Sequence, residues 1–262
     1  MAISGNATVD DVNAGMRQRR RTEPPRMLDD GRVRARLRPW PNEPQTAQLV
    51  LTDHTKAPSV NTLEQWLAII TEHGFRRVRT GALAESAAPP FAELGLEPIQ
   101  TLALLRLDLT RTMSFGTIQH ELRPVRGPRQ LAVAARLDRS AFENGWELDG
   151  PSILDACHAT PAHRIRLAIT SSDQPAGYII TGRNGAAGFI QRLAVERTLE
   201  GQGIASSLLC DGLVWLQRRG AREVLVNTNF DNDRALALYE RFGFRLLPES
   251  LHVFERAIEV SA

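Results

Sequence analysis

The sequence contains few of the residues that mark several common classes of protein. Of its 262 residues only Cys157 and Cys210 are cysteines, too few for a disulfide framework and without a partner at metal-site spacing. We interpret both as small buried hydrophobic residues. No stretch approaches the roughly 18 to 20 consecutive apolar residues of a membrane-spanning helix, and residues 1–6 lack an apolar signal core. We therefore expect a protein without membrane spans, located in the cytoplasm.

Lysine is nearly absent, since Lys56 is the only one among 32 basic residues. The 30 acidic residues leave a net charge of +2, which disfavours a protein that mainly coats nucleic acid. Residues 17–38 are an exception, with nine arginines against three acidic residues, so a nucleic-acid-linked role for this stretch is kept as an alternative. The six histidines show no ligand spacing, and we predict no bound metal.

The composition, 42% hydrophobic and 24% charged, is typical of a globular protein with one large domain or two small ones. Residues 1–28 show no sustained helical or strand period, and we interpret them as a flexible tail. Residues 29–112 and 118–262 are predicted to be two domains, with a linker near residues 110–121.

The first domain is predicted to have the order β-α-β-α-β. From Arg32 to Arg38, arginines alternate with Val33, Ala35 and Leu37, which indicates a strand with one solvated, charged face and one apolar face. Further strands are expected at residues 47–51, 77–80 and 99–109, and helices are expected to end at Gly74 and Gly95.

The same order recurs near the C-terminus, at residues 204–258. Phe91 and Gly95 correspond to Tyr239 and Gly243 at a constant offset of 148 residues, which indicates an internal repeat. Chance similarity of two such units is the alternative, because helices commonly end at glycine. Before the second copy, antiparallel strands are expected at residues 164–170, 176–181 and 188–195. Together these elements predict an α/β (α+β) protein with a mixed, strongly twisted sheet covered by helices.

A glycine-containing turn follows the last of these antiparallel strands. The strand ends in Leu193, Ala194 and Val195, and the turn leads into an amphipathic helix through Gly201, Gly203 and Ala205. Small residues let a ligand approach the backbone, and the amides of a helix N-terminus suit a pyrophosphate. The spacing is neither that of a dinucleotide fingerprint nor that of a P-loop, so the segment indicates only a phosphate-bearing ligand.

A second motif runs from Asn232 to Phe244. Its Asn232, Ala235, Leu238-Tyr239 and Gly243-Phe244 match, position by position, the pattern Asn-x-x-Ala-x-x-Leu-Tyr-x-x-x-Gly-Phe. With the glycine turn, residues 118–262 resemble the GNAT superfamily of acyl-CoA N-acyltransferases. The resemblance implies the GNAT fold, with the first copy as a truncated, degenerate half of that fold.

The resemblance also implies roles for particular residues. The pantetheine arm of acetyl-CoA would pair with the strand, and Asn232 would touch that arm. Tyr239 would be the general acid for the departing thiolate, and an amide near Val195 would polarise the thioester carbonyl. The implied cofactor-binding residues are Leu193, Ala194, Val195, Gly201, Gln202, Gly203, Ile204, Ala205, Ser206, Asn232 and Tyr239.

The general base is left open by the sequence. A primary amine is protonated at neutral pH, so a base must remove a proton before it can attack. Several members of the family place a glutamate on the central strand, but here that strand offers Phe189, Gln191 and Leu193 on one face. The remaining candidates are Glu196, Glu143, Glu147 and Asp149, of which we select Glu196 and Glu147 as catalytic candidates.

Two further departures concern binding of the cofactor. Glu200 stands where the family prefers glutamine or arginine, and we expect it to face water while Arg197 supplies positive charge. In the first copy, residues 53–59 before the helix contain no glycine and Phe91 replaces the tyrosine, so this copy should bind no CoA.

The function that follows from the resemblance is transfer of an acetyl group from acetyl-CoA to a primary amine, by direct attack in a ternary complex. A non-catalytic acyl-CoA-binding regulatory protein is the alternative. The sequence does not identify the amine, which could be a small molecule or a protein amine, and it does not fix the oligomeric state.

Overall fold

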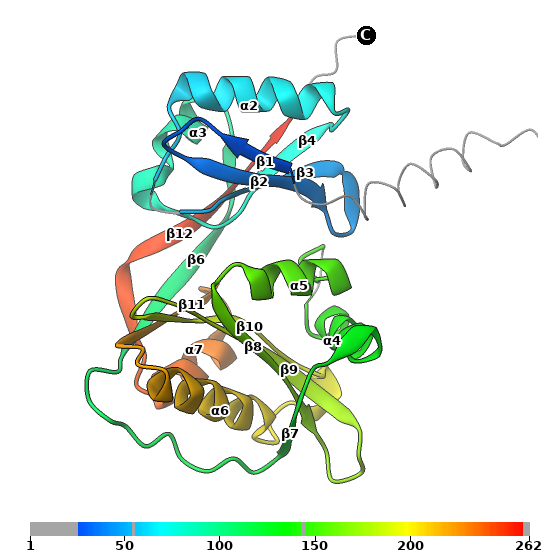
Figure 1. The fold of residues 1–262 in the computed structure, drawn as a ribbon, viewed down its shortest axis with the longest axis vertical. Coiled ribbons are helices and arrows are strands. Elements are labelled where there is room, and N and C mark those ends of the chain that lie inside the picture. The colour runs from blue at the N-terminus through cyan, green and yellow to red at the C-terminus, as the bar shows by residue number, and fades with distance from the viewer. Residues whose placement is uncertain (1–25, 54–55, 143–144, 259–262) are drawn as a thin grey trace, which may run out of the picture. The chain divides into compact units, whose positions relative to one another are not determined.

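The computed structural model of the protein describes residues 26–53, 56–142 and 145–258 (Figure 1). The chain divides into two compact units: residues up to Gln100 together with those from His252 form unit 1, and Thr101–Leu251 form unit 2. Most of the tail predicted at residues 1–28 lies outside the described residues. Its last three residues, however, begin the first strand.

Unit 1 is a small sheet with helices on one face. Its elements are β1 (Arg26–Asp29), β2 (Arg34–Trp40), β3 (Glu43–Leu51), α2 (Val60–Glu72), β4 (Arg77–Thr80), β5 (Leu83–Ala84), the 3-10 helix η1 (Glu85–Ala87), α3 (Pro89–Glu93) and the end of β12 (Arg245–Ala257). β1, β2 and β3 are antiparallel neighbours, whereas β3 and β4 are parallel, as the helical crossover through α2 requires.

The alternation predicted for β2 is confirmed. Ala35 and Leu37 are buried in one core cluster with Leu63 and Trp66 of α2, while Arg36 and Arg38 on the opposite face are half-buried. Alternate residues of a strand point to opposite faces, so the arginines cannot enter this core.

Unit 2 contains a mixed sheet covered on both faces. Its elements are β6 (Glu97–Asp108), β7 (Glu121–Pro124), α4 (Gly127–Ala141), α5 (Gly150–His158), β8 (Ala162–Ile169), β9 (Pro175–Asn184), β10 (Ala187–Val195), the 3-10 helix η2 (Arg197–Leu199), α6 (Ile204–Arg218), β11 (Glu223–Asn229), α7 (Asp233–Arg241) and the start of β12. The strand order is β6-β11-β10-β9-β8-β7, and β10 and β11 are the parallel pair. The predicted mixed α/β architecture is confirmed.

Helix α6 lies on one face of this sheet and helices α4 and α5 lie on the other (Figure 1), and each face has its own core cluster. Ile179 and Ile190 pack with Leu208 and Leu213 of α6 on one face, while Tyr178 and Ala194 pack with α4 and α5 on the other. Gly212 lets α6 approach closely, because a Cβ there would lie 2.9 Å from Oγ1 of Thr181 on β9.

The last strand of each repeat copy pairs with the other copy. β6 begins at residue 97 and β12 at residue 245, the same separation of 148 that relates the two motifs. Within unit 2, β6 pairs antiparallel with β11, for example Leu105 with Val226. Within unit 1, β12 pairs antiparallel with β4, for example Glu255 with Arg79. Each of these strands therefore begins in one unit and ends in the other.

Candidate active site

The central feature of unit 2 is the point where β10 leaves β11. Their parallel pairing covers Ala187, Gly188 and Phe189, although β10 continues to Val195 and β11 to Asn229. On its other side β10 pairs with β9 throughout, with a bulge between Ile190 and Arg192. A bulge bends a strand and increases its twist, which accounts for the separation. Residues 190–195 thus keep an edge that β11 does not use, and such an edge can bind an extended ligand as an added strand.

The predicted strand residues lie on this edge segment. Leu193 and Val195 pack toward the α6 side, and Ala194 is buried on the α4 and α5 side. Their side chains are thus committed to the two cores. Only their backbone groups can serve a ligand that runs along the strand.

The turn after β10 ends at the N-terminus of α6. Gly203 is the N-cap of this helix with φ of 78°, no side chain caps the helix, and its first turn holds no acidic residue. The first amides of a helix have no partner within it, so those of Ile204, Ala205 and Ser206 are oriented toward a ligand at this end. Gly201 also has φ of 78°, and a Cβ there would meet nothing within 4 Å. These amides and this open backbone fit a pyrophosphate.

A segment that the sequence analysis did not select lies over this turn. The backbone amide of Gln119 donates a hydrogen bond to Oγ of Ser207 at 3.1 Å, and Nδ1 of the His120 ring lies 3.1 Å from the same oxygen. Oε1 of Gln119 would be 3.2 Å from a Cβ at Gly203. Gln119 and His120 therefore border the glycine turn before α6, and no motif in the sequence marks them.

Glu200 does not simply face water, as the sequence analysis expected. Its carboxylate forms an ion pair with the guanidinium of Arg234 in the first turn of α7. The pair joins the residue before the glycine turn to the start of the second motif. Arg234 thus neutralises the Glu200 carboxylate, whereas the positive charge that we expect Arg197 to supply to the cofactor stays a prediction.

The second motif forms helix α7. The side chain of Asn232 caps this helix by accepting a hydrogen bond from the Ala235 amide at 3.1 Å. Tyr239 is 5% exposed and its ring centroid lies 5.5 Å from that of Phe244. Burial raises the pKa of the Tyr239 phenol well above its usual range. No hydrogen bond from its hydroxyl is found within the described residues, so the hydroxyl is available to a ligand.

The candidate bases have different surroundings. Glu196 accepts a hydrogen bond from Oγ of Ser140 in α4. Asp149 is the N-cap of α5 and accepts from the Ser152 amide at 2.9 Å, so its carboxylate already has a structural partner. Glu147 is half-buried in the segment between α4 and α5. Glu143 lies outside the described residues.

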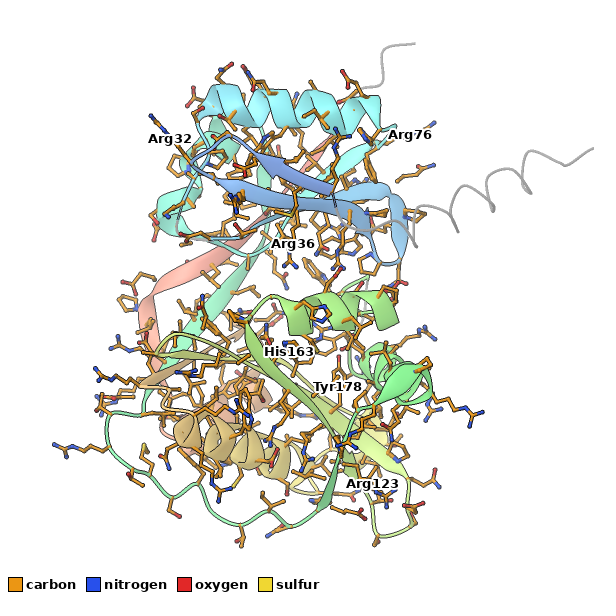
Figure 2. The ribbon with its side chains drawn as sticks, in the orientation of Figure 1. Arg32, Arg36, Arg76, Arg123, His163 and Tyr178 are labelled. Atoms are coloured by element: carbon orange, nitrogen blue, oxygen red, sulfur yellow. The ribbon has the colours of Figure 1, made fainter. Side chains whose placement is uncertain are left out.

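A buried polar cluster connects this segment to β10, and the sequence analysis did not foresee it. Asp138 of α4 accepts hydrogen bonds from Tyr178 of β9 and from Arg192 of β10, which lie 40 and 54 residues away in the chain (Figure 2 labels Tyr178). At such separations no spacing in the sequence could have indicated the contact.

In unit 1, the positions that correspond to the α6 N-terminus and to Tyr239 have different residues and contacts. The N-terminus of α2 is capped by Ser59, whose side chain accepts from the Thr62 amide at 3.1 Å. Phe91 is buried and stacks on Phe254 with ring centroids 6.2 Å apart. Unit 1 thus has a capped helix and an apolar ring where unit 2 has open amides and a phenol.

Within residues 26–53, 56–142 and 145–258, no group of three or more histidine, cysteine, aspartate or glutamate side chains is arranged to hold a metal ion. No helix of that part is both long and apolar enough to cross a bilayer.

The mixed sheet, in which β10 leads through a glycine turn into α6, agrees with the GNAT fold that the resemblance implies. Residues 131–244 match the sequence profile described as "Acetyltransferase (GNAT) family", and we identify this part of the chain as a GNAT acetyltransferase domain.

Two curated relatives share part of the sequence. The N-alpha-acetyltransferase 30 of Schizosaccharomyces pombe is 42% identical over 57 residues, which are 22% of this chain and 38% of that protein. The mycothiol acetyltransferase of Actinosynnema mirum is 25% identical over 168 residues, 61% of this chain and 57% of that one. The chain thus spans between about two fifths and three fifths of the length of these relatives.

Solved structures share the fold over most of the chain. A tandem GNAT protein from the clavulanic acid biosynthesis pathway is similar with a TM-score of 0.63 and 16% identity, covering 89% of this chain and 82% of that one. A GCN5-related N-acetyltransferase from Kribbella flavida gives a TM-score of 0.61 and 13% identity, with coverages of 94% and 95%. At these identities the likeness concerns the fold.

Proposed function

We propose that this protein is an acetyl-CoA-dependent N-acetyltransferase that acts on a primary amine. The observation that carries the proposal is the edge of β10 at residues 190–195, left by β11 and followed by the uncapped N-terminus of α6. An extended arm can pair with the first feature while a pyrophosphate meets the second. Acetyl-CoA has both an extended arm and a pyrophosphate, so one molecule could occupy both features.

The binding roles follow from this placement. Backbone groups of Leu193, Ala194 and Val195 would pair with the pantetheine arm. Amides of the turn from Gly201 to Ser206, with Gln202 between the glycines, would hold the pyrophosphate. Asn232 caps α7 with its side-chain oxygen, so its amide nitrogen is the group it can still offer to the arm.

Acetyl-CoA supplies the activated acetyl thioester when it is bound. The backbone amide near Val195 would polarise the thioester carbonyl and so favour attack by the amine nitrogen on the carbonyl carbon. As the new C–N bond forms, the C–S bond breaks and negative charge develops on sulfur. The Tyr239 hydroxyl would donate a hydrogen bond to that sulfur, and its raised pKa keeps it protonated at neutral pH.

The acceptor amine must lose a proton to attack. Glu147 and Glu196 are the proposed groups, either directly or through water. Glu196 shares its carboxylate with Ser140, whereas Glu147 belongs to the segment between α4 and α5. No carboxylate lies on β10 itself, where Gln191 donates to the Ala156 carbonyl at 2.6 Å.

That lack of a strand carboxylate favours one second candidate, a non-catalytic acyl-CoA-binding regulatory protein. Such a protein would keep the β10 edge and the α6 amides but would need no base. The two candidates predict the same binding and differ in turnover alone.

Calorimetric titration with acetyl-CoA and CoA, followed by an assay of thiol release, tests the proposal. Because one relative is named an N-alpha-acetyltransferase and another a mycothiol acetyltransferase, the panel should contain peptide N-termini as well as small-molecule amines. Binding with turnover on one class of amine is expected. Binding without turnover on any amine would favour the regulatory protein, and absence of binding would refute both.

A further inference from the structure

Asp138 of unit 2 is fully buried, and its carboxylate accepts four hydrogen bonds from described residues. Its Oδ2 accepts from the Tyr178 hydroxyl at 2.5 Å and from Nε of Arg192 at 2.8 Å. Its Oδ1 accepts from Nη2 of Arg192 at 2.8 Å and from the Leu148 amide at 2.5 Å. A buried charge is tolerated where such partners satisfy it, so this carboxylate depends on all three neighbours.

The Leu148 amide that Asp138 binds follows Glu147 in the chain, and Arg192 binds the residue that precedes Glu147. Its Nη2 donates to the carbonyl of Trp146 at 2.8 Å, and its guanidinium lies 3.4 Å from the centre of the Phe142 ring. The carbonyl of Trp146 and the amide of Leu148 flank Glu147 in the chain. One ion pair therefore holds the backbone on both sides of that residue.

The ion pair is also joined to the edge of β10. Arg192 comes directly after the bulge and directly before Leu193, within the segment that β11 leaves. Ser140, two residues after Asp138 in α4, donates to Glu196 just past the end of the strand. Helix α4, residues 145–149 and the edge of β10 are thus connected by side-chain hydrogen bonds.

We propose that Asp138 and Arg192 are positioning residues that fix residues 145–149 beside β10 and thereby set the place of Glu147 and Trp146 for the acceptor amine. The part that concerns the acceptor rests on the proposed function, whereas the part that concerns the order of residues 145–149 does not. Tyr178 supports the carboxylate as a permanent donor, because burial first and the Asp138 charge second raise the pKa of its phenol.

The test compares Asp138→Asn and Arg192→Lys with Asp211→Asn. Asp211 of α6 is a matched control, since it forms an ion pair with Arg164 of β8 on the other face of the same sheet. Hydrogen–deuterium exchange of residues 145–149 is measured for each variant, together with acetyl-CoA affinity and the kcat and KM for the best acceptor amine.

We expect exchange at Leu148 to rise about tenfold or more in Asp138→Asn, because a charge-assisted hydrogen bond is lost. The KM for the amine should rise by a similar factor, while the Kd of acetyl-CoA stays within about twofold. Arg192→Lys should act in the same direction through Trp146. Asp211→Asn should leave both the exchange of residues 145–149 and the KM unchanged.

Unchanged exchange in a folded Asp138→Asn protein would overturn the proposal, and so would equal effects of the control. If that variant does not fold, Tyr178→Phe takes its place, since it removes one donor and keeps the carboxylate and its arginine. If the wild-type protein turns over no amine, the proposed function has failed, and the exchange measurement still decides whether the ion pair orders residues 145–149.

Discussion

Tyr239 shows how burial prepares a side chain for one task. Its phenol is enclosed by apolar residues, and desolvation raises its pKa by disfavouring the anion. A phenol of this kind gives up its proton reluctantly, so in the proposed reaction it would act by donating a hydrogen bond to the developing thiolate. The raised pKa would keep it a donor over the whole physiological pH range.

Tyr239→Phe should therefore lower kcat by about 10- to 100-fold, as expected for loss of an acid or a donor at the reacting atom. The ring and its packing on Phe244 are retained, so the Kd of acetyl-CoA and the melting temperature should hardly change. Steady-state kinetics and calorimetry on the same preparation measure both. An unaltered kcat would remove Tyr239 from the mechanism.

The two tyrosines of the chain, Tyr178 and Tyr239, also make stability depend on alkaline pH. Burial is the largest cause that raises the pKa of each phenol in the folded protein, so the folded state retains protons that the unfolded state loses. Their contribution is complete below the unfolded pKa of about 10 and declines as the pH rises above it. We expect urea-unfolding free energies to fall between pH 9 and pH 11. Tyr239→Phe should show a smaller fall, and an equal fall would contradict the assignment.

Among the helices and strands, β10 contributes most to the candidate site. Its bulge and early separation from β11 provide the open edge, and its C-terminal end leads into the glycine turn before α6. The ion pair of Glu200 and Arg234 places a carboxylate beside that turn, and in the proposed complex this charge would repel the pyrophosphate.

Glu200→Gln should therefore strengthen acetyl-CoA binding, by about two- to tenfold at low ionic strength, with the gain decreasing as salt screens the charges. Stability should change by less than about 1 kcal/mol, because the pair is exposed. Glu121→Gln is the control, since Glu121 pairs with Arg123 on β7, outside the turn. Weaker binding by Glu200→Gln would show that Glu200 acts by holding Arg234 in place for the ligand.

The sequence predicted the positions of the helices and strands better than it predicted which of them pack or pair with one another. Periodicity located β2, β4, α6 and β10 to within a few residues, because it records which face of an element is buried. It missed β1 and β5, which are short, and it placed the start of the last strand at residue 250 where β12 begins at Arg245. The Asp138 cluster was beyond reach, since its contacts depend on the packing of α4 against β9 and β10.

For the molecule as a whole, the most important feature is that β6 and β12 each begin in one unit and end in the other. Pattern and repeat located β6 to within two residues at each end and β12 over its C-terminal part, but a hydrophobic pattern does not show which strand will be the neighbour of each in the sheet. Because β6 supplies Ala103, Leu105 and Leu107 to the core of unit 2, the domain that carries the candidate site includes a strand from the first copy.

Residues 109–262 alone should then fail to unfold cooperatively, since β11 would expose an edge and the core would lose three buried side chains. Urea titration followed by circular dichroism, compared with the intact protein, measures this. In the intact chain Leu105→Asp should be strongly destabilising, by about 3 kcal/mol or more, through an unpaired charge in the core. A cooperative fragment that binds acetyl-CoA would contradict the expectation.

The pairing of β12 with β4 also affects the order in which parts of the chain fold during synthesis. Domains usually fold as the ribosome releases them, N-terminal first. Here β4 pairs with β3 on one side but has no partner on its other side until β12, the last strand of the described chain, has been made, so that edge of unit 1 stays open for most of translation. Arg77 and Arg79 lie on that edge strand and form ion pairs with Glu43 of β3, and charged side chains on an edge strand oppose pairing with a second nascent chain. When β12 has been made, Glu255 forms ion pairs with both arginines as well.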